Sequence, residues 1–345
     1  MQQWLLRKAT TQASKALDTE VLAGKVIWNF PNNIILDDVE ILDQSGDSLI
    51  YIEQLETKIR SIDLDNQFFK FGDVHLKRPI VKFNSQNGQA GMNYLFLTEI
   101  GQTAAGGQLA RLWFKKIIIE DGVFEFRRDD LPEPSSRKFD ETNLRFEKIN
   151  AELLSMEIIG DSLNFKVKSM AAKDKSGLEL KHLACKAKIH SNGMEFDEIL
   201  MRTNESSIEH YIAFDYDGYP MMGDFIDSVY VRAELSNTVL SMRDLAYFSN
   251  TLEQYGDEKF KLSSSLKGTV TNFKLRDMLV ELGDGGRLTG EAKIKGLPDW
   301  EVSYVDIDVD EFSSSISEME RLLKLDFPEE VKRFGNTQFK GHITG

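Results

Sequence analysis

Hydrophobic residues recur at nearly every second position along most of this 345-residue chain. The segment from Ile34 to Ile59 shows the pattern well: it alternates, breaks at Ser45-Gly46-Asp47, and alternates again. Alternation with a period of two is typical of a strand that buries one face, and a short polar break between two such runs is typical of a hairpin. We therefore predict two paired strands here. The same kind of pattern continues through both halves of the chain.

Two interruptions of the alternation carry information about strand register. In segment 68–83, Pro79 shifts the pattern, as an edge strand or a bulge would. In segment 113–130, apolar runs lie on either side of Asp121-Gly122, a dipeptide typical of the tight turn in a hairpin. We predict a bulge or an edge at the first break and two short paired strands at the second.

The cleanest strands place a set of apolar side chains on one face, and these are our candidate binding residues. Deciding which face points inward requires the register, because a slip of one residue moves every side chain to the other face. Phe165 is the firmest choice, because its strand alternates most cleanly with polar positions. The full set is Val74, Leu76, Phe124, Phe126, Leu163, Phe165, Val167, Ile212, Phe214, Val229 and Val231.

The first twenty residues have a helical pattern instead. We predict an amphipathic helix over 1–20 whose apolar stripe is Leu5, Leu6, Ala9, Ala13, Ala16 and Leu17. This helix either caps the β core or lies on a membrane surface, since basic residues beside an apolar stripe suit an interface. No window approaches the roughly 20 apolar residues of a membrane span, and the start lacks the apolar core of a signal peptide.

Three further segments are predicted to be helical. Segment 91–101 is short, and 241–256 has Ser241 as a suitable N-cap. Segment 313–335 is predicted to form two helices that are separated before Pro328, because proline ends a preceding helix. Between helices and strands, short groups of Gly, Asn and Asp favour stacked meanders over βαβ units.

Length and composition divide the chain and exclude some functions. A chain of 345 residues is long for one core, and the Pro/Ser-rich charged loop at 129–141 is the best break, giving β regions 21–130 and 131–345. The formal net charge is −14. Because nucleic-acid binders neutralise phosphates with clustered Lys and Arg, we expect no nucleic-acid partner.

Residues that could carry chemistry are sparse. The one cysteine, Cys185, is expected to be a buried apolar residue rather than a redox group, and the five histidines lack zinc-like spacing with Cys or Glu. In the glycine-rich segment 283–296, the residues after Gly290 alternate like a strand and do not open a helix, which favours a β-turn over a phosphate-binding loop. On a strand, the carboxylates of Asp306, Asp308 and Asp310 share one face, and a solvated face is favoured over a calcium site. We expect no catalytic residues, no metal and no cofactor.

The strands themselves are therefore the best candidate for the functional device. Strands stacked about 4.8 Å apart in an open sheet of some fifteen strands would extend roughly 70 Å. We predict a mainly β fold: an elongated, curled antiparallel β-sheet groove with the N-terminal amphipathic helix and a few short helices. A continuous apolar surface in such a groove is typical of a ligand or lipid site, where an acyl chain lies along the trough with its headgroup at the open side.

Several stretches together resemble a known family. The resemblance is carried by segments 4–17, 21–59, 68–84, 91–97, 240–252, 266–299 and 331–345, and the sequences "DQSGDSLIYIEQL" and "GRLTGEAKIKGLPD" are the most specific pieces. They are similar to the N-terminal periplasmic part of TamB-like proteins (translocation and assembly module) of the AsmA-like superfamily, in the type found in Bacteroidota. The resemblance covers essentially the whole chain, although 130–235 matches only in texture.

The resemblance implies a fold and a role. It implies a periplasmic β-sheet groove (a "β-taco") that is anchored in the inner membrane by one helix and works with a TamA-like outer-membrane barrel. The implied functions are phospholipid transport from the inner to the outer membrane and outer-membrane protein assembly, with no catalytic residues. The anchor and the barrel-binding region have no counterpart in this sequence, so we expect a piece of a longer protein that begins just after the anchor.

Three classes of function remain to be compared. We favour a groove whose partners are phospholipid acyl chains. A scaffold that assists outer-membrane protein insertion, by pairing its exposed sheet edges with unfolded strands, is the alternative. It shares the same fold, so a groove filled by its own side chains would favour it. An enzyme would require a pocket with paired carboxylates of perturbed pKa, and we do not expect one.

Overall fold

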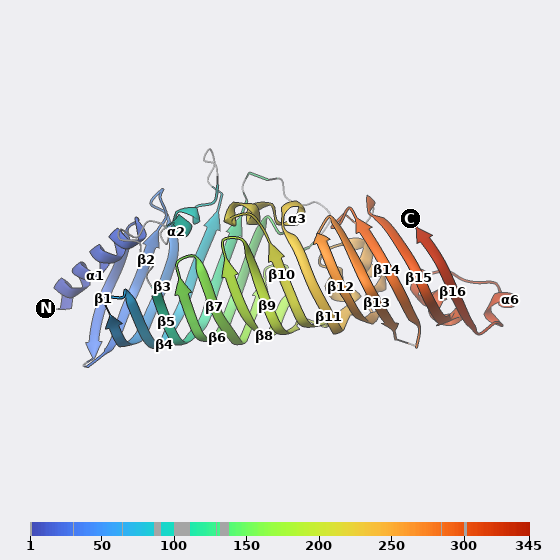
Figure 1. The fold of residues 1–345 in the computed structure, drawn as a ribbon, viewed down its shortest axis with the longest axis horizontal. Coiled ribbons are helices and arrows are strands. Elements are labelled where there is room, and N and C mark those ends of the chain that lie inside the picture. The colour runs from blue at the N-terminus through green and yellow to red at the C-terminus, as the bar shows by residue number, and fades with distance from the viewer. Residues whose placement is uncertain are drawn as a thin grey trace. The chain divides into compact units, whose positions relative to one another are not determined.

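The computed structural model describes residues 2–29, 31–63, 65–85, 91–99, 111–128, 130–131, 138–283, 285–299 and 302–345. Its described residues form one mainly β structure, a sheet of sixteen strands whose order follows the chain from β1 to β16 (Figure 1). The sheet is not closed into a barrel. The chain divides into two compact units, and each is described by itself. Unit 1 comprises Met1–Pro134, Asp140–Phe196 and Asp217–Gly223, and unit 2 comprises Ser135–Phe139, Asp197–Tyr216 and Asp224–Gly345.

The strands have the following bounds. Strands β1 to β8 are Val21–Asn29, Asn33–Leu42, Ser48–Asp63, Phe68–Asn84, Arg111–Arg127, Asn143–Ile159, Ser162–Asp174 and Glu179–His190. Strands β9 to β16 are Gly193–Arg202, Ser207–Asp215, Tyr230–Ser241, Lys259–Thr269, Asn272–Leu282, Arg287–Lys295, Tyr304–Ser315 and Asn336–Thr344. The helices are α1 (Gln2–Leu17), α2 (Leu95–Glu99), η1 (Tyr219–Asp224), α3 (Phe225–Ser228), α4 (Met242–Leu245), η2 (Asn250–Tyr255), α5 (Ile316–Leu323) and α6 (Glu329–Lys332).

The hairpin predicted around Ser45-Gly46-Asp47 is confirmed, because β2 and β3 pair antiparallel across this turn. Asp43 explains why the chain reverses here. Its Oδ1 accepts hydrogen bonds from the backbone N–H of Ser45 at 2.8 Å and of Asp47 at 3.0 Å. A side chain that satisfies two turn donors fixes the turn locally, and Gly46 supplies the positive φ of 87° that the turn requires.

The hairpin predicted at Asp121-Gly122 is wrong. Residues 111–127 form one continuous strand, β5, and Asp121 has a φ of 54° in its interior. The dipeptide is compatible with a positive φ in a β-bulge as well as in a turn, and here it forms the bulge. β5 also runs parallel to β4, so the predicted antiparallel sheet is interrupted at this pair. The other neighbouring strands from β1 to β8, and all neighbours from β10 to β16, pair antiparallel.

Residues with positive φ recur at corresponding places in neighbouring strands. In unit 1 the interior residues with positive φ include Asp38 in β2, Arg78 in β4, Asp121 in β5 and Lys148 in β6, all exposed. The pairing register shifts beside Asp121 and Lys148, which makes these two positions bulges. The backbone N–H of Asp121 donates to Asn150 Oδ1 of β6 at 3.2 Å. A bulge is a place at which a strand can bend.

Unit 2 has a similar series of irregularities. Asn237 in β11 and Asp277 in β13 have φ values of 51° and 50°. The pairing register shifts by one residue beside each of them. In β4 of unit 1, Pro79 follows Arg78, whose φ is 46°. The pairing of β4 with β3 and β5 does not shift at this point, so the predicted bulge is not confirmed, and the predicted edge is wrong because β4 has two partners.

The helical predictions were mostly correct in place and too long in extent. A helix covers 2–17 beside β1, but the side chains of Leu5, Leu6, Ala9 and Ala16 lie outside the described residues. Segment 241–256 breaks into α4 and η2, with Ser241 as N-cap accepting from the backbone N–H of Arg243. Segment 313–335 forms α5 and α6 with Pro328 between them, and residues 313–315 belong to β15.

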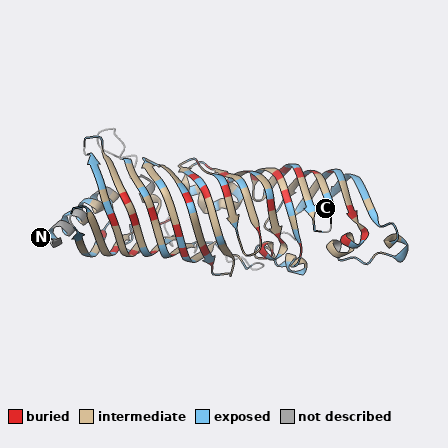
Figure 2. Cartoon of the chain, turned by 90° about the horizontal axis from the view of Figure 1, so that it is seen from below, coloured by how far each residue is buried: buried red, intermediate tan, exposed pale blue. Residues whose placement is uncertain are grey.

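Buried residues recur near the middle of the strands in both units, as Figure 2 shows. In unit 2 the core cluster is formed by Leu262, Leu275, Met278 and Ala292, which come from three consecutive strands of one sheet. Among the described residues, no second sheet packs on this core.

Candidate ligand-binding surface

One face of each unit is apolar from strand to strand, because residues directly opposite each other on paired strands lie on the same face. In unit 1, a row of directly opposed residues crosses β4 to β8; we call it the unit 1 ladder. It consists of Val74, Ile117, Leu153, Val167 and Cys185. The polar residues between them along each strand point to the other face.

Unit 2 has an apolar row of the same kind, which we call the unit 2 ladder. It crosses β10 to β16 and consists of Ile212, Ala233, Leu266, Leu275, Ala292, Ile307 and Ile343. A second row runs beside it and contains Phe214, Val231, Phe273, Ile294 and Val305. The apolar surface of this unit is therefore at least two residues wide along the strand direction.

The bulges keep each strand on its correct face. In β13, Phe273 and Leu275 precede the bulge at Asp277, whereas Met278 and Val280 follow it. Strict alternation would place the second pair on the polar face. The extra residue shifts the alternation by one position, so all four side chains contribute to the apolar cluster of unit 2.

The structure places the sequence-predicted residues on these faces with different degrees of exposure. Val74 and Val167 are only 6% and 4% exposed, so they contribute little accessible surface. Val229 lies at the end of α3 rather than in a strand and is fully buried. The half-buried members are Leu76, Phe124, Phe126, Leu163, Phe165, Ile212, Phe214 and Val231. The binding role of all eleven residues stays a prediction.

Segments outside the strands cover parts of the apolar faces. In unit 1, the ring of Tyr94, in the turn before α2, packs on Phe83 at 4.3 Å between centroids, and Phe83 contacts Phe124 of the adjacent strand edge-on at 5.4 Å. In unit 2, Phe225 of α3 contacts Phe214 at 5.3 Å. Aromatic contacts of this geometry stabilise the packing beyond the area that they bury. One of the candidate phenylalanines, Phe214, is thus partly covered by its own chain.

A segment of unit 1 joins opposite ends of its strands, and we call it the η1 bridge. The hydroxyl of Tyr219 donates to the backbone carbonyl of Asp161, in the turn between β6 and β7, at 3.3 Å. Four residues further on, the carbonyl of Gly223 accepts a hydrogen bond from the guanidinium of Arg128, just after β5. Burial raises the pKa of Tyr94, and the neighbouring Tyr219 raises it further, which places Tyr94 close to the same segment.

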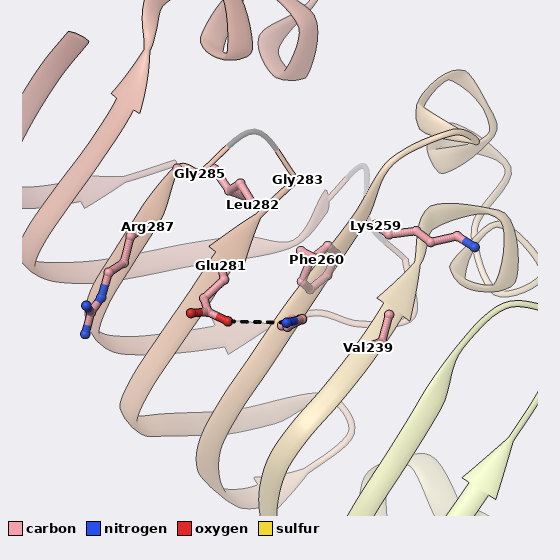
Figure 3. A pocket seen from close by; sticks show the side chains of 10 residues that line it. Val239, Lys259, Phe260, Glu281, Leu282, Gly283, Gly285 and Arg287 are labelled. Atoms are coloured by element: carbon pink, nitrogen blue, oxygen red, sulfur yellow. Dashed lines mark ion pairs between the residues drawn. The ribbon is translucent and has the colours of Figure 1, made fainter.

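Unit 2 has a hollow of about 490 Å³ where β11 to β14 meet the turn after β13 (Figure 3). Phe260 and Leu282 line it, while Lys259, Arg287 and the pair Lys261–Glu281, 4.0 Å apart, contribute charge. The glycine-rich segment forms the predicted turn: Gly285 N–H donates to the Leu282 carbonyl. The hollow combines apolar contacts with a charged margin, which suits an amphiphilic ligand.

The residues considered for other chemistry lie in ordinary surroundings. Cys185 is 3% exposed on the unit 1 ladder, and burial raises the pKa of its thiol to about 11, so the prediction of a buried apolar residue is confirmed. Asp306 and Asp308 lie beside His342 of β16, at 3.3 and 2.7 Å. Within the described part of the chain, no group of three or more His, Cys, Asp or Glu side chains is arranged to hold a metal ion.

The sequence reasoning missed several residues of the apolar faces. Leu275, Met278 and Ala292, which are almost fully buried in the unit 2 cluster, were not among the candidates. Their strands alternate, but each pattern slips by one residue at a bulge or is interrupted by glycine, so the period-two signal is short on either side. The slip itself is the signal that would have identified β13.

Comparison with known proteins adds no family assignment. No family model, no curated protein and no solved structure matches this chain. Among the residues that the structure describes, no helix combines the length and the apolar character needed to cross a bilayer.

Proposed function

We propose that the apolar faces of this protein bind the acyl chains of phospholipids, in a sheet that curls into a β-taco-like groove. The observation that carries the proposal is the pair of apolar ladders, which run across consecutive strands and have no second sheet packed over them. Each methylene group that such a face removes from water contributes about 0.8 kcal/mol. An acyl chain therefore gains most by contacting several neighbouring strands at once.

The η1 bridge supports the curl in unit 1. A straight strand of 17 residues, the length of β6, spans about 55 Å. The segment from Tyr219 to Gly223 spans at most about 18 Å even when fully extended, yet it forms hydrogen bonds near both ends of the β5–β6 pair. Strands that bend at aligned bulges explain how the two ends approach each other.

The ligand is proposed to lie with its chains on the apolar face and its headgroup toward water. Half-buried side chains such as Phe165 and Leu163 offer the accessible apolar surface in unit 1. In unit 2 the hollow beside Phe260 and Leu282 adds apolar surface next to the guanidinium of Arg287. Lys259 and Lys261 at the same margin are paired with Glu205 and Glu281, so the preference for an anionic headgroup rests on Arg287.

The cellular role is proposed from the resemblance in the sequence. On this proposal the protein is a periplasmic bridge in phospholipid transport from the inner to the outer membrane, contributing to outer-membrane biogenesis. In the full-length protein the groove is anchored in the inner membrane and works with a TamA-like outer-membrane barrel. No catalytic step is part of the proposal, because the groove acts by solvating its cargo.

Native mass spectrometry with lipid extraction tests the proposal, on protein purified from bacteria without detergent. Phe165 and Lys166 are neighbours on β7 that point to opposite faces, so Phe165→Asp and Lys166→Asp form a matched pair. We expect co-purifying phospholipid that Phe165→Asp or Phe214→Asp removes and Lys166→Asp retains. Circular dichroism checks that all three variants fold.

Two outcomes count against the proposal. Equal lipid loss in folded Phe165→Asp and Lys166→Asp would refute the assigned orientation of β7. A clean protein mass, with no uptake of added fluorescent phospholipid, would refute the conduit and favour the scaffold for outer-membrane protein insertion.

A further inference from the structure

The polar face of unit 2 carries a row of four cations, which we call the basic row. Arg232, Lys267, Lys274 and Lys293 are directly opposite one another across β11, β12, β13 and β14. Each residue is adjacent in sequence to a member of the unit 2 ladder, so the row lies on the opposite face of the same strands. It is therefore independent of the apolar surface to which acyl chains are proposed to bind.

The basic row gathers positive charge in an acidic chain, whose formal net charge is −14. Like charges directly opposite each other destabilise a sheet. Arg232 is neutralised by Asp215 through hydrogen bonds of 2.6 and 2.8 Å. Lys267 is directly opposite Lys274, and Lys274 is also opposite Lys293. Within the described chain, neither Lys267 nor Lys274 forms an ion pair that would offset this repulsion.

A small hollow lies beside the unpaired part of the row. Its volume is about 120 Å³, and it is lined by Tyr230, Ser265, Lys267, Lys274 and Arg276. These residues come from β11, β12 and β13, so cations and hydroxyl groups approach it from three strands. They are all hydrogen-bond donors.

Two carboxylates lie near the hollow and limit what it can bind. Glu234 is directly opposite Ser265 and accepts a hydrogen bond from its hydroxyl at 3.0 Å. Glu291 of β14 follows Gly290, which is opposite Met278, and lies on the polar face beside Arg276. Arg276, opposite Ser265 on the other side, forms no ion pair among the described residues. Three cations against two carboxylates leave the hollow with a net positive charge.

We propose that this hollow binds a phosphate group, as a monoester, a diester or the free ion. Several donors converging from different directions match the oxygens of a tetrahedral anion, and guanidinium and ammonium groups are the usual phosphate partners in proteins. A bound phosphate also relieves the repulsion between Lys267 and Lys274. The group comes either from a soluble phosphate or from a phospholipid headgroup.

The test begins with inorganic phosphate, titrated calorimetrically into the full chain at constant ionic strength, because exposed charges are screened by salt. Lys274→Gln removes one cation of the hollow. Lys188→Gln is the matched control, since Lys188 is an exposed lysine on the polar face of β8 in unit 1. We expect Lys274→Gln to weaken phosphate binding about tenfold and Lys188→Gln to leave it unchanged.

Vesicles of phosphatidylglycerol distinguish the two sources of the group. Co-sedimentation that Lys274→Gln reduces and Lys188→Gln does not identifies a lipid headgroup, whereas phosphate binding without co-sedimentation identifies a soluble phosphate. Both results support the site. No heat of phosphate binding by the wild-type chain, or equal weakening by the two variants, would overturn it, and neither result bears on acyl-chain binding by the apolar face.

Discussion

Inserting one alanine after the bulge residue Asp277 tests how the two faces of β13 are kept distinct. The bulge already accommodates one extra residue, so a second one moves every side chain after it to the opposite face. Met278, Val280 and Leu282 would leave the apolar face of unit 2, and Glu281 would enter it. The matched variant is Asp277→Gly, which keeps the extra residue and suits the positive φ of 50° at this position.

The magnitude follows from the burial of the displaced side chains. Met278 is 5% exposed, so its exposure costs about 2 kcal/mol, and the half-buried Val280 and Leu282 cost about 1 kcal/mol each. The sum of about 4 kcal/mol is a large part of the 5–15 kcal/mol that stabilises a typical domain. Asp277→Gly is expected to stay within about 1 kcal/mol of the wild type, because relief of strain and the added freedom of the unfolded chain oppose each other.

Hydrogen exchange read by mass spectrometry is the appropriate assay, because the two units need not unfold together and a single denaturation midpoint would average them. We expect peptides from β12 to β14 to lose most of their protection in the insertion variant and to keep it in Asp277→Gly. Unchanged protection in the insertion variant would show that the bulge accommodates the added residue as well, and the argument that one extra residue sets the face would be wrong.

Two further predictions concern single polar groups. The thiol of Cys185, whose pKa is raised to about 11 by burial, is expected to react with an aromatic disulfide reagent at pH 8 at least a hundredfold more slowly in the native than in the urea-unfolded chain; native and unfolded rates within tenfold of each other would contradict the assigned burial. Burial alone would raise the pKa of Asp244, but hydrogen bonds from Thr203 and from the backbone N–H of Glu205 and Ser206 lower it below 3.8. The ionised carboxylate therefore stabilises the fold fully above the pKa of the unfolded chain, and this stabilisation is lost as the pH falls through the lower pKa of the folded chain. In urea titrations, Asp244→Ala should lower the free energy of unfolding by about 3 kcal/mol at pH 7 and by less at pH 3. An equal loss at both pH values would contradict the assigned hydrogen bonds.

Much of the fold could be predicted from alternation because a strand that buries one face must alternate. The hairpin at Ser45-Gly46-Asp47 and the helix cap at Ser241 were both recognised from local sequence. Each depends on residues close together in the chain. Local chemistry of this kind can be read without knowing which strands are partners.

Several bulges were also visible in the sequence but were not recognised. At each of these, two adjacent polar residues separate two alternating runs, and the alternation resumes one position late. The pairs are Glu120-Asp121 and Glu147-Lys148 in unit 1, and Ser236-Asn237, Arg276-Asp277 and Asp310-Glu311 in unit 2. Reading Asp121-Gly122 as a turn ignored that its neighbour Glu120 is polar as well.

Features that depend on which strands are partners could not be predicted from the sequence. The sequences of β4 and β5 do not indicate that these strands run parallel, because a strand shows the same alternation in a parallel and in an antiparallel pair. The basic row requires the register of four strands before Lys267 and Lys274 are known to be opposite. The η1 bridge joins residues 58 and 95 positions apart, and no local pattern connects them.

The η1 bridge has a consequence for how stiff unit 1 is. A ladder of backbone hydrogen bonds forms equally well in a flatter or a more strongly bent sheet, so the ladder does not choose between these shapes. In unit 1 the degree of bending is set by the bulges and by two hydrogen bonds, which Tyr219 and Arg128 donate. The curvature of unit 1 can therefore change at little cost in free energy. Tyr219→Phe would remove the hydrogen bond to Asp161, leave every strand paired and let the two ends of the β5–β6 pair move apart.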